Sequence, residues 1–149
     1  MTDSPKYVLI TAARNEAAHI GETIRTVLAQ TIVPMRWVIV SDGATDDTDI
    51  IVAGYAASNA WIRLVRRERE PDVIGFVSKV RALQLALVEL RDIDYDFIGN
   101  LDADITLEPS YYETICTKFG EDRSLGLAGG FVYDLLNGEY RKHSPDTSN

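Results

Sequence analysis

Several residue types are scarce in this chain of 149 residues, and each shortage excludes a class of protein. The only cysteine is Cys116, so no disulfide can form within the chain, which agrees with a reducing compartment. No apolar run approaches the roughly 18 residues of a membrane span. The start of the chain is acidic and lacks the apolar core of a signal peptide. We therefore expect a cytoplasmic protein without a transmembrane segment.

Positive charge is also scarce, with 15 Lys and Arg against 23 Asp and Glu and a net charge of -8. Surfaces that bind nucleic acid or anionic membranes need clustered cations, so we expect neither partner. A phosphate ligand of such an acidic chain needs a metal ion. The hydrophobic content of 46% and the length predict one soluble domain with a sizeable core.

Cys116 and the two histidines offer no catalytic pattern. Cys116 follows Tyr112 and precedes Phe119 at helical spacing, which favours a buried core position over a nucleophile. His19 and His143 have no partner at metal-ligand or nucleophile spacing, so both are interpreted as solvated side chains.

Apolar runs alternate with helix-period segments along the chain. The predicted strands span residues 7–12, 36–40, 62–66, 97–101 and 125–133. The predicted helices span residues 17–30, 47–58, 78–91 and 110–119, and residues 67–77 form a charged loop. We expect Asn15 to cap the first helix and Gly120 to end the fourth. In the third helix, Leu83, Leu87 and Leu90 are expected to face the core. This alternation predicts right-handed crossovers and a three-layer α/β/α sandwich with a mostly parallel sheet.

The strongest chemical feature is the pair Asp102 and Asp104, which follows the apolar strand at residues 97–101. Residues i and i+2 of extended chain point to the same side, so both carboxylates can face one ligand while Ala103 leaves room. Hard oxygen ligands suit Mg²⁺ or Mn²⁺. Asp94 and Asp96 have the same spacing but precede the strand, whereas open α/β sheets bind ligands at the carboxyl ends. Taken alone, the spacing favours a solvated acidic turn over a site, because turns favour Asp.

Other strand ends are expected to meet this pair at one crevice. The turn at residues 12–16 has no glycine, which excludes the phosphate cradles of dinucleotide-binding and P-loop proteins. Asp42 could accept hydrogen bonds from a nucleobase, although Asp-Gly is also a common turn. Lys79 could reach a diphosphate, although exposed helix ends often carry such charges.

The order of four motifs resembles that of the family 2 glycosyltransferases, which have the GT-A fold. The resemblance covers roughly residues 6–134. Its motifs are AARNE at residues 12–16, SDGATD at 41–46, SKVRALQ at 78–84 and LDAD at 101–104. The chain departs from the family pattern where Ala12 replaces the usual Pro, Arg14 a frequent Tyr, and Ser41 the first Asp of a pair. These departures leave the donor base open.

The resemblance implies a glycosyltransferase that moves a sugar from a UDP- or GDP-linked donor to the hydroxyl of an unknown acceptor, with Mg²⁺ or Mn²⁺ and inversion. The implied nucleoside pocket contains Ala12, Arg14 and Glu16, with Asp42 reading the base. Asp102, Ala103 and Asp104 would lie by the ribose and the metal, with Asp104 as the direct ligand and Lys79 near the diphosphate.

The resemblance also implies that residues 1–136 form the donor-binding domain, followed by a polar tail at 137–149, and that the acceptor half is missing or shortened. No catalytic base is assigned, because neither Asp134 nor Glu139 is marked by its setting. A lipid acceptor would bring the protein to a membrane surface without a span of its own.

Three alternatives to an active transferase remain open at this point. The first is a non-catalytic module that binds nucleotide diphosphates. The second is a receiver-like signalling domain, which would want paired acids after the first strand, where this chain has Arg14, Asn15 and Glu16. The third is a sugar nucleotidyltransferase, which would want a glycine-rich first turn.

Overall fold

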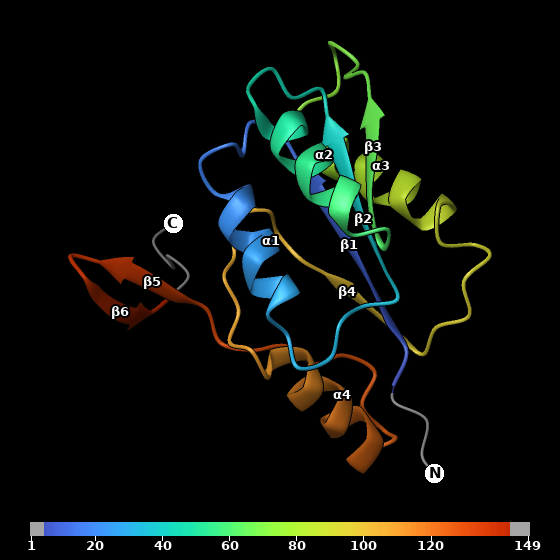
Figure 1. Ribbon diagram of the computed structural model, residues 1–149, viewed down its shortest axis with the longest axis vertical. Helices are drawn as coiled ribbons and strands as arrows, with labels where there is room; N and C mark the ends of the chain where they lie inside the picture. The colour runs from blue at the N-terminus through green and yellow to red at the C-terminus, as the bar shows by residue number, and fades with distance from the viewer. Residues whose placement is uncertain (1–4, 144–149) are drawn as a thin grey trace.

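The computed structural model describes residues 5–143 and is built around a four-stranded parallel sheet. Its strands are β1 (Tyr7–Ala13), β2 (Arg36–Asp42), β3 (Ile62–Arg67) and β4 (Phe97–Asn100). They lie in the order β3-β2-β1-β4, with every neighbouring pair parallel, so β1 is central and β4 is an edge strand (Figure 1). All four carboxyl ends therefore lie at the same end of the sheet.

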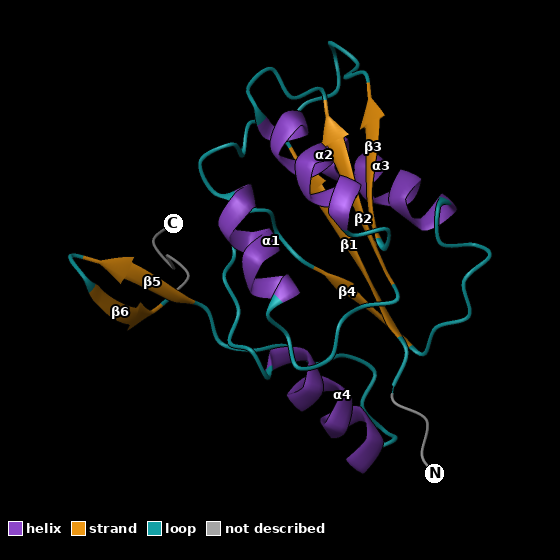
Figure 2. Cartoon of the chain, in the orientation of Figure 1, coloured by secondary structure: helices purple, strands orange, loops and turns teal. Residues whose placement is uncertain are grey.

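Four helices cover the two faces of this sheet. They are α1 (Ile20–Leu28), α2 (Thr48–Ser58), α3 (Phe76–Val88) and α4 (Tyr111–Glu121). In Figure 2, α2 crosses in front of the sheet and α3 lies behind it. The buried side chains of α1, α2 and α4 belong to one core cluster and those of α3 to a second cluster. The predicted three-layer α/β/α sandwich with a parallel sheet is confirmed.

The alternation of β1 explains why there are two cores. Tyr7 and Leu9 point into the cluster that contains α1, whereas Val8 and Ile10 point into the cluster that contains α3. A strand that is covered on both faces needs apolar residues at every position. Residues 7–10 meet this requirement, because all four are apolar and buried. The same holds for β2, whose residues from Trp37 onward are all buried.

The expected cap of the first helix was wrong. The helix α1 begins at Ile20 rather than at residue 17, and its N-cap position is His19. Asn15 instead adopts a positive φ of 55°, which Asn tolerates better than most residues. Its Oδ1 accepts hydrogen bonds from the backbone N and the Oγ1 of Thr45, at 2.8 and 3.2 Å. Asn15 thus ties the loop after β1 to the loop after β2.

The helices α3 and α4 also differ in detail from the expectation. The third helix begins at Phe76 and faces the sheet with Ala82 and Ala86, which are four residues apart. Leu90 lies in the turn after the helix and is buried in the same cluster, as expected. Leu83 is partly buried, but Leu87 is exposed, so its predicted core position was wrong. The fourth helix runs through Gly120 to Glu121.

The strand predicted at residues 125–133 was also wrong. The chain is irregular there and then forms a hairpin of β5 (Tyr133–Leu136) and β6 (Glu139–Lys142) in a separate sheet. Asn137 and Gly138 both have positive φ, as an Asn-Gly hairpin turn requires. Residues 139–142 of the expected polar tail are therefore a strand, and the hairpin projects from the body (Figure 1). Residues 144–149 lie outside the described residues.

No helix within residues 5–143 has both the length and the apolar character that crossing a bilayer requires.

Candidate donor-binding site

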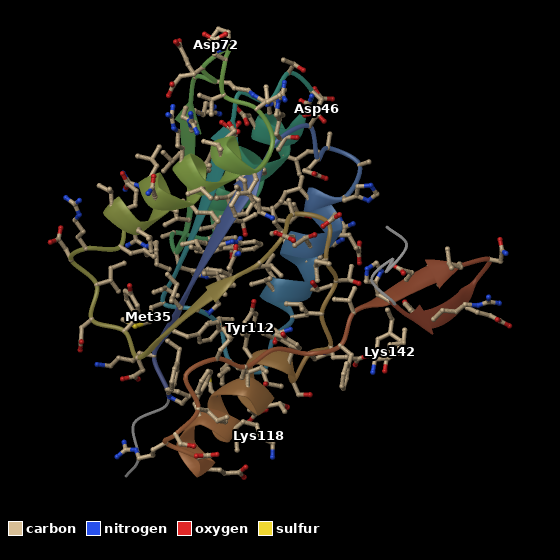
Figure 3. All side chains as sticks on the ribbon, turned by 180° about the vertical axis from the view of Figure 1, so that it is seen from behind. Met35, Asp46, Asp72, Tyr112, Lys118 and Lys142 are labelled. Atoms are coloured by element: carbon tan, nitrogen blue, oxygen red, sulfur yellow. The ribbon has the colours of Figure 1, made fainter. Side chains whose placement is uncertain are left out.

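A cavity of about 390 Å³ lies at the carboxyl ends of β1, β2 and β4. It is lined by Ala12, Ala13, Arg14, Glu16, Asp42, Arg69, Gly75, Ser78, Lys79, Asp102, Ala103 and Asp104. This end of the molecule carries Asp46 and Asp72 in Figure 3, whereas Tyr112 and Lys118 lie toward the opposite end. The structure brings all eight residues named from the sequence to this one cavity; their individual roles stay predictions.

The loop that carries Asp102 and Asp104 is held by two buried threonines. Thr11 Oγ1 donates a hydrogen bond to the Leu101 carbonyl oxygen at 2.7 Å, and Thr23 Oγ1 donates to the Ala103 carbonyl oxygen at 2.8 Å. Ala103 is buried between the two exposed aspartates. These two bonds fix the backbone of the turn, and both Asp102 and Asp104 line the cavity.

Carboxylates crowd this side of the cavity. Burial raises the pKa of Glu16, and the negative charge of Asp104 raises it further. Asp46 and Asp102 add to this increase, while His19 opposes it. Neighbouring charges of one sign favour either a bound proton or a bound cation. The acidic end of the cavity is therefore a place that attracts positive charge.

One cation of the protein already lies there, because Lys79 Nζ is 2.6 Å from Asp102 Oδ1. Within residues 5–143, no group of three or more His, Cys, Asp or Glu side chains could hold a metal ion by itself. Two exposed carboxylates nevertheless fit Mg²⁺ or Mn²⁺ in the usual mode, in which one or two carboxylates share the ion with substrate phosphates and water. The residues present fit a metal that arrives with its ligand.

Asp42 forms the other end of the cavity. It is the last residue of β2, is only 5% exposed, and accepts a hydrogen bond at Oδ2 from the Ser78 hydroxyl. Its Oδ1 is buried without a hydrogen-bond donor. Arg67 Nη1 lies 3.3 Å from this Oδ1 but donates its hydrogen bond to the Ser78 carbonyl oxygen at 3.1 Å. Asp42 is therefore charge-compensated, with one oxygen bonded to the Ser78 hydroxyl and the other buried beside Arg67.

The fold and the motif order agree with a comparison to known families, in which the Glycosyl transferase family 2 model matches residues 8–147. The chain belongs to this family. Chondroitin synthase of Escherichia coli is 31% identical over 121 residues, which are 81% of this chain and 16% of that protein. The chain thus spans about a sixth of that relative's length.

Solved structures show the same fold. TarS 1-349 of S. aureus in complex with UDP is 20% identical over 78% of this chain and 32% of its own, with a TM-score of 0.63. The mannosyltransferase PcManGT of Pyrobaculum calidifontis, in complex with GDP-Man and Mn²⁺, is 26% identical over 84% of this chain and 35% of its own, with a TM-score of 0.61. The receiver-like alternative is thereby removed for this family 2 glycosyltransferase.

Sequence reasoning missed four residues that line the cavity of this family 2 glycosyltransferase. One is Ala13, the last residue of β1; the other three, Arg69, Gly75 and Ser78, come from the loop after β3 and the start of α3. The charged loop at residues 67–77 was expected at this crevice, but nothing in its sequence marks Arg69 over its neighbours. Ser78 precedes Lys79 in the helix, and only its contact with Asp42 reveals its place.

A second cavity, of about 730 Å³, lies between β4, α4 and residues 125–132. Its lining is mainly apolar and aromatic, although Lys79 and Asp102 border both cavities. The thiol of Cys116 lines it, and burial raises the pKa of this thiol, so the core position expected for Cys116 is confirmed. His143 is exposed as expected, and its Nδ1 lies 2.8 Å from Asp134 Oδ2. The smaller cavity remains the candidate site because Glu16, Asp42 and Asp104 line it and not the larger one.

Proposed function

We propose that this family 2 glycosyltransferase binds a nucleotide-diphosphate sugar in the smaller cavity and transfers the sugar to an acceptor hydroxyl. The observation that supports this proposal is that the two ends of the cavity carry different charged groups. One end has a buried, half-satisfied carboxylate at Asp42, and the other has Asp102 and Asp104 beside Lys79. A nucleotide sugar has matching parts, a base with N–H donors at one end and a diphosphate at the other.

The nucleoside half of the donor is assigned to the end formed by β1 and β2. Asp42 accepts a hydrogen bond from the base, while Ala12 and Arg14 form the neighbouring wall of the cavity. Glu16 lies near the acidic end, because it lines the cavity and feels the charge of Asp104. The small side chain of Ala12 leaves room for a flat ring.

The diphosphate half is assigned to the end formed by the loop after β4. Asp102 and Asp104 would hold Mg²⁺ or Mn²⁺, with Asp104 as the direct ligand. Such an ion neutralises charge on a departing diphosphate. The complex of the mannosyltransferase with GDP-Man and Mn²⁺ supports a nucleotide sugar and a divalent ion for this chain as well. Lys79, now paired with Asp102, is placed to donate a hydrogen bond to a phosphate oxygen instead.

The proposed reaction is an inverting displacement at the anomeric carbon. The acceptor oxygen forms the new glycosidic bond as the bond to the diphosphate oxygen breaks, and the acceptor proton passes to a base. No residue of this chain is assigned as that base. The donor-binding domain is proposed to span residues 1–136. The cytoplasm is the proposed location, since Cys116 has no partner within the chain.

Calorimetric titration of UDP and GDP into the full chain, with and without Mn²⁺, tests this function. We expect binding that Mn²⁺ strengthens and that Asp104→Ala weakens by about tenfold or more. The matched control is Asp94→Ala, because Asp94 has the same spacing to Asp96 but pairs with Lys6 at the amino end of β4. Failure of both nucleotides to bind, in either buffer, would refute the donor site.

A non-catalytic module would bind the nucleotide in the same way, so turnover needs its own measurement. Incubation of the chain with UDP- and GDP-sugars, followed by detection of released UDP or GDP, tests it. Release that requires Asp104 supports the transferase. Binding without release, with and without added sugar acceptors, favours the non-catalytic module.

A further inference from the structure

Lys79 and Asp102 form an ion pair at the boundary between the two cavities. The Nζ of Lys79 is 2.6 Å from Asp102 Oδ1, and both residues line the smaller and the larger cavity. The Lys79 side chain is 41% exposed and the Asp102 side chain 52%. An ion pair this exposed is weak, because water and salt screen it. The pair can therefore open without disturbing the core.

The backbone beside Lys79 is fixed, so the lysine side chain is the part that can move. Ser78, directly before it, is buried and donates its hydroxyl to Asp42 Oδ2. The carbonyl oxygen of Ser78 accepts a hydrogen bond from Arg67 Nη1 at 3.1 Å. These bonds hold the first turn of α3 against the ends of β2 and β3. Lys79 thus has a fixed backbone and a long flexible side chain whose ammonium can reach more than one partner.

The two aspartates of the acidic end differ in what neutralises them. Lys79 pairs with Asp102, whereas among residues 5–143 no ion pair engages Asp104. Asp104 shares its end of the cavity with Glu16, and the charges of these two acids act on each other. A divalent ion that binds here without other ligands must displace Lys79 from Asp102 or lie near its positive charge. Both weaken the binding of that ion.

A nucleotide diphosphate changes this balance because it brings negative charge of its own. Phosphate oxygens accept charge-assisted hydrogen bonds from an ammonium group, so a diphosphate in the cavity gives Lys79 a second partner. When Lys79 turns to the phosphate, Asp102 Oδ1 is released. The released carboxylate and the phosphate oxygens can then share one divalent ion.

We propose that Lys79 competes with Mg²⁺ or Mn²⁺ for Asp102, so that the divalent ion binds tightly only when a diphosphate gives Lys79 another partner. The proposal rests on the proposed donor-binding function and adds to it a coupling between the ion and the nucleotide. Lys79 then has two effects of opposite sign, because it weakens binding of the free ion and strengthens binding of the nucleotide. A lysine that only contacts phosphate has the second effect alone.

The first test measures binding of Mn²⁺ to the full chain without nucleotide, from the loss of the electron paramagnetic resonance signal of free Mn²⁺. We expect Lys79→Met to bind Mn²⁺ about fivefold more tightly than wild type, because a competing ion pair and a repelling charge are both removed. Lys79→Arg keeps the charge and should keep the wild-type affinity. Lys6→Met is the matched control, because Lys6 is 44% exposed and pairs with Asp94, at the amino end of β4.

A double variant locates the bound ion. Asp104→Ala, added to Lys79→Met, should remove the gain in Mn²⁺ affinity, because the ion loses its proposed direct ligand. A gain that persists without Asp104 means that the ion binds elsewhere on this acidic chain, and it overturns the proposal. Equal Mn²⁺ affinity of Lys79→Met and wild type, or no detectable binding to either, overturns it too.

Titration of UDP and GDP in the presence of Mn²⁺ tests the effect of opposite sign. We expect Lys79→Met to bind the nucleotide that wild type prefers about fivefold more weakly, because the charge-assisted bond to phosphate is lost. Weaker binding of both Mn²⁺ alone and the nucleotide would indicate a structural role for Lys79 and contradict the competition. If wild type binds neither nucleotide, the proposed function fails, while the Mn²⁺ measurements still decide whether Lys79 competes for Asp102.

Discussion

The strand ends and the C-terminal segment at residues 122–143 are stabilised in opposite ways. At the strand ends, buried side chains bond across the sheet, as Trp37 Nε1 does to Thr11 Oγ1 at 2.9 Å. In the C-terminal segment nearly every residue is exposed, including Leu127 at 89% and Phe131 at 73%. Both regions are rich in apolar residues. Apolar character alone therefore does not make a core; it needs a covering layer on each face.

The largest difference should appear when one leucine is removed from each region. Leu9→Ala deletes a fully buried side chain of the central strand and should lower the free energy of unfolding by about 2–5 kcal/mol. Leu127→Ala should change it by less than about 0.5 kcal/mol. Urea unfolding followed by circular dichroism measures both. Equal losses would mean that the C-terminal segment is covered in solution.

A smaller difference is expected for hydroxyl groups. Thr11→Val removes both the donor to the Leu101 carbonyl and the acceptor for Trp37 Nε1, leaving two buried polar groups unpaired. We expect a loss of about 1–3 kcal/mol of unfolding free energy. Ser124→Ala breaks an exposed hydrogen bond to Asp122 and should cost less than about 0.5 kcal/mol. The same urea titrations compare the two, and a costless Thr11→Val would contradict the buried network.

The smallest effect concerns pH, and its sign should differ between the regions. The pKa of Glu16 is raised by burial and by Asp104, so ionising Glu16 destabilises the fold as pH rises. The pKa of Asp122 is lowered by its hydrogen bond from the Ser124 hydroxyl, so its ionised form stabilises the fold.

Relative to wild type, Glu16→Gln should therefore gain stability as the pH rises above about 4, and Asp122→Asn should lose it as the pH rises from about 2 to about 5. Denaturant midpoints across this range, in a buffer with chelator, measure both trends. Parallel trends in the two variants would show that the crowding of acids around Glu16 has no energetic weight.

The sequence was sufficient to predict the parallel sheet and the position of the candidate site at its carboxyl edge. The first four strands were predicted correctly because each is an apolar run. The polar residues that follow these strands lie together because parallel strands end at the same edge of the sheet. The details that failed depend on contacts between distant residues. Asn15 looked like a helix cap, yet it bonds Thr45, which is 30 residues away. No local pattern encodes such a partner.

The C-terminal prediction failed for a different reason. Residues 125–133 have the apolar character of a buried strand, but among residues 5–143 no strand pairs with residues 125–131. A local signal for the true strands was present, because Asn137 and Gly138 form the turn that favours a two-residue hairpin loop. The predicted strand rested on the apolar run and not on this turn. Turn chemistry was the better guide where no layer covers the chain.

The buried contact of Trp37 with Thr11 also gives the protein an optical reporter. Trp37 is fully shielded from water, and the hydroxyl that it bonds also holds the loop leading to Asp102. Once Trp61, the other tryptophan, is replaced by Phe, the emission of this indole reports on the hydroxyl that holds the loop leading to Asp102. Ligand entry and loosening of the site can be followed there without adding a dye.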